Sequence, residues 1–190
     1  TVPASPIWQG TDSSHSWVAA NFNPEFADGK NVIFGEAGYK TVTVDQAVTA
    51  GAVTVRGQDY TFNLADGGSL TAGSLTVTSD SLSLTGAGTV SAGSISASGK
   101  TINIGQDVVL QGDSTAAATL AGSGTYVLAS GTKTLGSISL GSDWTGYVRL
   151  SNVAFSNDNL DNLARSGAAG IEMYGITQGY VYNWSGGTVH

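Results

Sequence analysis

The chain of 190 residues contains no cysteine, and its only histidines are His15 and His190, the last residue. Without cysteine there is no disulfide bond, no cysteine nucleophile and no thiolate metal ligand. A zinc site usually needs three protein ligands, which one histidine inside the fold does not supply. We therefore expect no metal site and no cofactor.

Catalytic sequence motifs are also missing. No Gly-x-Ser-x-Gly segment is present, so nothing marks a serine nucleophile for His15 to activate. No Asp-Thr-Gly or Asp-Ser-Gly tripeptide is present, although such turns usually present the paired carboxylates of aspartic proteases. The sequence thus contains no motif that by itself indicates an enzyme.

Charge is scarce, since only 11% of the residues are charged and the formal net charge is −7. An acidic surface repels nucleic acids and anionic lipids, so neither is an expected partner. No apolar run approaches the ~18 residues that a membrane-spanning helix requires, so we expect no membrane insertion by this segment.

A repeat dominates what the sequence does contain. Three units begin at Ala50-Gly51, Ala72-Gly73 and Ala92-Gly93, which are 22 and 20 residues apart. In each unit, apolar residues follow the alanine at positions +3, +5, +10 and +12. They are Val53, Val55, Tyr60 and Phe62; Leu75, Val77, Leu82 and Leu84; and Ile95, Ala97, Ile102 and Ile104. Alternation of this kind predicts two short strands per unit, each with one buried face.

Units of about 20 residues in one register favour an all-β fold, a right-handed parallel β-solenoid or β-helix. The alternative is an antiparallel β-sandwich, which also has short alternating strands. Strands are predicted at Val32–Phe34, Thr41–Val44 and Thr125–Ala129. Leu135–Leu140 is predicted to open a further unit, with Ile138 at +3 and Leu140 at +5.

We expect a single domain, residues 1–190, in three parts. Residues 1–48 form an N-terminal cap with the first strands, because all three prolines and the aromatic residues Trp8, Trp17, Phe22, Phe26, Phe34 and Tyr39 lie there. Stacked repeats need such a cap over their first unit. Residues 49–143 form the solenoid, and residues 144–190 form C-terminal strands with a short helix.

The N-terminal third resembles the autotransporter-associated β-strand repeat of Gram-negative bacteria. The matching residues are Trp17, Asn21-Phe22, Pro24, Asp28-Gly29, Val32–Phe34, Thr41–Val44, Ala50–Val55, Gly57 and Tyr60–Phe62. The resemblance is close over about the first 65 residues. Residues 66–140 resemble passenger β-helices only in general, through their Gly/Ser/Thr-rich coils. It implies a passenger-type β-helix that is secreted or exposed at the cell surface, associated with the outer membrane. The family motif is structural and brings no catalytic residues. Family members end in a membrane barrel, which this sequence lacks, so it resembles either a fragment or a short free-standing relative.

Acidic residues recur at one corner of the repeat. Asp59, Asp80 and Lys100 each precede the strand at +10. Rungs of a solenoid lie ~4.8 Å apart, so the two carboxylates are expected to be neighbours, as in a hydrolase that uses paired acids. The alternative is a column of solvated turn residues. Asp66, in the turn Asp66-Gly67-Gly68-Ser69, is a further candidate with the same alternative.

Aromatic residues gather near the C-terminus. Trp144, Tyr147, Tyr180, Tyr182 and Trp184 form either a platform on which sugars stack or a lid over the end of the solenoid. The oxygen-rich segment Asn157–Asn162 lacks the glycine and glutamate of a calcium-binding loop and is better explained as a helix cap.

Three functions remain open. The chain is a passenger-type scaffold or adhesin module that contacts host glycoprotein, a hydrolase acting on mucin-like glycoprotein through paired aspartates, or a glycan-binding module. An assay for peptidase or glycosidase activity separates the second from the others.

Overall fold

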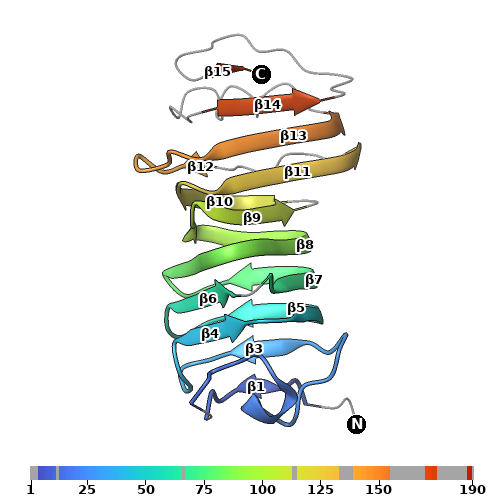
Figure 1. Cartoon of the computed structure of the whole chain (residues 1–190), viewed down its shortest axis with the longest axis vertical. Helices are drawn as coiled ribbons and strands as arrows, with labels where there is room; N and C mark the ends of the chain where they lie inside the picture. The colour runs from blue at the N-terminus through green and yellow to red at the C-terminus, as the bar shows by residue number, and fades with distance from the viewer. Residues whose placement is uncertain are drawn as a thin grey trace.

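The computed structural model describes residues 4–11, 13–65, 67–112, 115–132, 139–154, 170–174 and 188–189. Almost every element is a strand, and the strands stack in parallel along one axis into a β-solenoid of about 5 turns (Figure 1). This confirms the predicted solenoid and excludes the antiparallel sandwich. Within the described residues, the antiparallel pair β1 (Ile7–Trp8) and β2 (Phe22–Asn23) is confined to the N-terminal end.

The remaining strands follow in chain order toward the C-terminal end. They are β3 (Val32–Phe34), β4 (Thr41–Val44), β5 (Ala47–Val55), β6 (Tyr60–Leu64), β7 (Ser69–Val77), β8 (Ser81–Ile104), β9 (Asp107–Gly112), β10 (Thr115–Gly122), β11 (Thr125–Thr132), β12 (Ser139–Leu140), β13 (Tyr147–Ala154), β14 (Gly170–Tyr174) and β15 (Thr188–Val189). Three of them match the predicted strands closely: β3 and β4 coincide with the prediction, and β11 begins where expected.

The register of the repeat is as predicted. Ala50 pairs with Ala72, and Ala72 pairs with Ala92, so the three units are aligned on their alanines. In the +10 strands, Tyr60 pairs with Leu82. All the apolar positions at +3, +5, +10 and +12 are buried.

Each turn has three sides, whereas the sequence predicted two. The third side carries the residues just before the alanines: Val48 pairs with Leu70, Leu70 with Val90, and Val90 with Leu110. These residues are buried and close the interior. The prediction missed this side because the Ala-Gly pair that follows it was interpreted as a corner. Each strand on this side was therefore left with only one large apolar residue, too few to show alternation.

The Ala-Gly pairs owe their glycines to close packing between turns. A Cβ atom on Gly73 would lie 2.7 Å from the backbone oxygen of Gly51, and one on Gly93 would lie 2.7 Å from that of Gly73. Such contacts are closer than side chains tolerate, so only glycine fits in this column. The repeat seen in the sequence therefore marks a corner where neighbouring turns approach closely.

One predicted unit lies on a different side. Leu140 was expected at +5, but β12 pairs with β10, and Leu140 is the partner of Leu120. Leu120 in turn pairs with Ile102, which is a +10 residue. Leu140 therefore continues the +10 side. Alternation identifies a strand but not its side, which depends on the irregular length of the preceding turn. Ile138 lies outside the described residues.

The N-terminal end is covered by aromatic side chains, as predicted. Trp8, Trp17, Phe22 and Phe26 are at most 8% exposed, and Trp17 contacts Phe34 of the first turn with ring centroids 5.0 Å apart. Together they cover the apolar interior that the first turn would otherwise expose to water. Tyr39 is an exception among the predicted cap residues, since it is 52% exposed and its ring stacks on that of His15.

Tyr60 links the cap to the first complete turn. Its hydroxyl donates a hydrogen bond to the backbone oxygen of Gly35 at 2.8 Å and accepts one from Gln58 at 2.9 Å. Burial raises the pKa of Tyr60, while the hydrogen bond from Gln58 lowers it by less. The hydroxyl is therefore neutral, and its hydrogen bond to Gly35 attaches the loop 35–39 to the first complete turn.

Candidate functional site

The predicted acidic corner consists of Asp59, Asp80 and Lys100. Asp59 lies just before β6, Asp80 just before β8, and Lys100 inside β8. Because Tyr60 pairs with Leu82, Asp59 is level with Ser81, and Asp80 is level with Gln58. The two acids therefore lie on neighbouring turns but are offset by one residue along the strand.

Each acid of this corner has a partner on the following turn. The Oδ1 atom of Asp59 accepts a hydrogen bond from the backbone N–H of Ser81 at 2.7 Å. The Nζ atom of Lys100 donates to Oδ1 of Asp80 at 2.9 Å, and the Asp80 side chain is 92% exposed. Both contacts link successive turns, so the corner has a structural use that requires no substrate.

A surface pocket of ≈ 380 Å³ lies beside the acidic corner and brings both aspartates into one wall. Its lining consists of Lys40, Gly57, Gln58, Asp59, Thr78, Ser79 and Asp80. The lining residues carry carboxylate, amide, hydroxyl and ammonium groups, which suit a ligand rich in hydroxyl groups. Asp66 lies outside the described residues.

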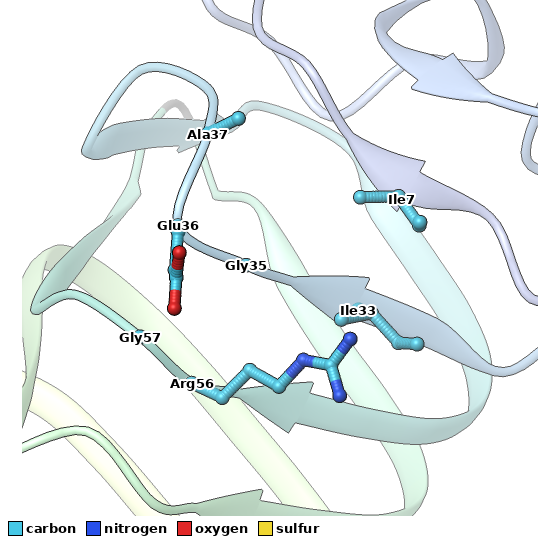
Figure 2. A pocket seen from close by; sticks show the side chains of 7 residues that line it. All are labelled: Ile7, Ile33, Gly35, Glu36, Ala37, Arg56 and Gly57. Atoms are coloured by element: carbon cyan, nitrogen blue, oxygen red, sulfur yellow. The ribbon is translucent and has the colours of Figure 1, made fainter.

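A second pocket, of ≈ 420 Å³, lies closer to the N-terminal end, and we call it the Arg56 pocket (Figure 2). Ile7 of β1, Ile33 of β3 and Arg56, which follows β5, line it together with Gly35, Glu36, Ala37 and Gly57. No sequence pattern predicts this pocket, because the pocket depends on where the cap places β1 beside β3. Ile7 and Ile33 are 26 positions apart in the sequence but are register partners in the sheet.

The predicted aromatic group is divided between interior and surface. Trp144 is only 2% exposed, so its ring packs inside the solenoid and presents no face to a sugar. Tyr147 begins β13 and is 46% exposed. Tyr180, Tyr182 and Trp184, as well as Asn157–Asn162, lie outside the described residues.

The outward positions of one side carry small polar groups, and we call this side the hydroxyl face. Two columns run across β4, β6 and β8. They are Thr41, Thr61, Ser83 and Asn103, and Thr43, Asn63 and Thr85. None of these residues is charged. Neighbours in the columns contact each other, as in the 3.4 Å hydrogen bond from Asn103 to Ser83.

The part of the chain that the structure describes contains no group of three histidine, aspartate or glutamate residues placed to hold a metal ion. In the same residues, no helix has the length and apolar character needed to cross a membrane.

Comparisons with known proteins return nothing for this chain: no family model, no curated protein and no solved structure matches it.

Proposed function

We propose that the chain is a secreted or surface-exposed scaffold module of adhesin type, which contacts the glycans of a host glycoprotein. The observation that carries this proposal is the continuous stack of turns in one register, from β3 to β15. The interior is filled by packed side chains, so the surface of a long stack is what the molecule offers to partners. Such a surface suits repeated contacts along an extended ligand.

Surface chemistry supports glycans as the partner. The hydroxyl face offers neutral donors and acceptors at intervals of ~4.8 Å from turn to turn. Neutral groups lose less solvation free energy on binding than charged ones, and they can exchange hydrogen bonds with sugar hydroxyls. The N-terminal resemblance to the autotransporter-associated repeat, and with it a Gram-negative outer membrane as the site of display, belongs to the same proposal.

The hydrolase alternative rests on one observation, the presence of Asp59 and Asp80 in the wall of one pocket. We favour the scaffold, because each of these carboxylates already has a partner on the next turn. A glycan-binding module that uses Tyr147 in place of the hydroxyl face is the second alternative.

The protein is expected to bind an immobilised mucin-type glycoprotein without cleaving it. Binding is measured by surface plasmon resonance, and release of peptides or sugars is measured by mass spectrometry between pH 4 and 7. We expect saturable binding, weakened by Thr61→Arg on the hydroxyl face, and no released product.

Three variants complete the experiment. Asp59→Asn and Asp80→Asn should leave binding unchanged, and Asp107→Asn, an exposed acid at the start of β9, is the matched control. Products that appear with the parent and disappear with the first two variants, but not with the third, would establish the hydrolase instead. Absence of both binding and products would overturn the proposal.

A further inference from the structure

The Arg56 pocket combines an exposed cation with an apolar wall. Arg56 is exposed, and in the described part of the chain no carboxylate forms an ion pair with it. Figure 2 shows its side chain running along the pocket, with the guanidinium beneath Ile33. A guanidinium binds a carboxylate through two parallel hydrogen bonds, so this end of the pocket suits a carboxylate on a ligand.

The apolar wall lies beside the guanidinium. Ile7 is 37% exposed, and its register partner Ile33 is partly exposed on the same face of the sheet. The two branched side chains offer a small apolar area next to a charge. A ligand group of matching size is a methyl or a short acyl group, whose burial against them is favourable.

Glu36 forms the opposite wall, and its place depends on a glycine. The residue below it is Gly57, which has a φ of +80°, and a Cβ atom there would collide with Cγ of Glu36. Figure 2 shows the Glu36 carboxylate pointing down toward Gly57, away from the guanidinium. The carboxylate accepts hydrogen bonds from hydroxyl or amide N–H groups of a ligand. It repels anions such as phosphate or sulfate, whose negative charge is shared by all of their outer oxygen atoms.

We propose that the Arg56 pocket binds an acidic N-acylated sugar, the kind of residue that ends many glycans. Its carboxylate lies on Arg56, its acyl methyl on Ile7 and Ile33, and its hydroxyl groups donate to Glu36. This inference rests on the proposed function and gives one part of the glycan a specific place. The separation of Arg56 from Glu36 selects a ligand with a carboxylate at one end and donors at the other, and disfavours phosphate or sulfate.

The test is a titration of the full chain with the methyl glycoside of N-acetylneuraminic acid, followed by NMR of the isoleucine methyl groups. We expect saturable shifts confined to Ile7 and Ile33. Arg56→Met should weaken binding by about 10-fold or more, because a charged hydrogen-bonded pair is lost. Lys30→Met removes an exposed cation elsewhere and should leave binding unchanged.

The ligand itself provides a control that does not depend on folding. The carboxamide of the same glycoside, which lacks the negative charge, should bind the parent protein as weakly as the acid binds the Arg56→Met variant. Equal binding of acid and carboxamide would overturn the inference, and so would equal competition by acetate or by inorganic phosphate.

Failure of this inference is distinguishable from failure of the proposed function. If the glycoprotein still binds after its acidic sugars are removed, and binds the Arg56→Met variant equally well, the scaffold proposal stands and the Arg56 pocket has no part in it. If neither the glycoprotein nor the glycoside binds, both proposals fail.

Discussion

Gly86→Ala is expected to lower the free energy of unfolding by about 2–5 kcal/mol. The backbone at Gly86 has a φ of +84°, and an L residue there costs about 1–2 kcal/mol. In addition, a Cβ atom at this position would collide with the backbone oxygen of Leu64, its partner on the turn below. Forcing atoms into a packed site costs about 1–3 kcal/mol more. Urea denaturation followed by circular dichroism measures the change.

Gly99→Ala is the matched control for this experiment. Gly99 also has a positive φ, +68°, but a Cβ atom there has no neighbour within 4 Å. We therefore expect it to show only the backbone cost of about 1–2 kcal/mol. Equal losses at Gly86 and Gly99 would mean that the turns do not approach each other at Gly86 as the structure has them.

Leu84→Ala is expected to cost about 2–5 kcal/mol, the usual range for a buried leucine. Leu84 is 1% exposed and lies at +12 of its unit, directly above Phe62. Turns above and below hold the surrounding backbone in register, so it has little freedom to close the cavity. The measurement is again the denaturation midpoint together with its slope.

Ser83→Ala, one residue away, tests the face assignment. Ser83 points outward and accepts only a long hydrogen bond from Asn103, at 3.4 Å. Its loss should cost about 1 kcal/mol or less. If the serine variant were the more destabilised of the two, the inner and outer faces of β8 would be exchanged and the solenoid interior would be wrongly assigned.

Much of the fold was predictable because the repeat encodes contacts between turns. The four apolar positions of each unit are buried, and the alanines align as their spacing indicates. The third side was also present in the sequence, in Val48, Leu70 and Val90. It was missed because a strand that ends in Ala-Gly has too few large apolar residues to stand out from a corner.

The candidate sites were less predictable, for a physical reason. Asp59 and Asp80 were expected at one corner because each shortly precedes the +10 strand of its unit, at +9 and +8, and they line one pocket. The Arg56 pocket joins Ile7 to Ile33 through the fold of the cap, and no periodic pattern reports such a contact. A repeat predicts the contacts that recur from turn to turn, whereas this pocket forms once, where the cap meets the first turn.

The alignment of neighbouring turns is tested most directly by introduced pairs of cysteines. The chain has no cysteine of its own, so no other disulfide can form. Thr61 and Ser83 are register partners on the hydroxyl face. Their Cα atoms are therefore ~5 Å apart, within the range that a disulfide spans. Asn103 is level with Ser83 one turn further on, so it is ~10 Å from Thr61, which is too far. We predict that Thr61→Cys/Ser83→Cys oxidises completely within the monomer, and that Thr61→Cys/Asn103→Cys does not. Efficient bridging of the second pair, or none of the first, would contradict the stacked solenoid.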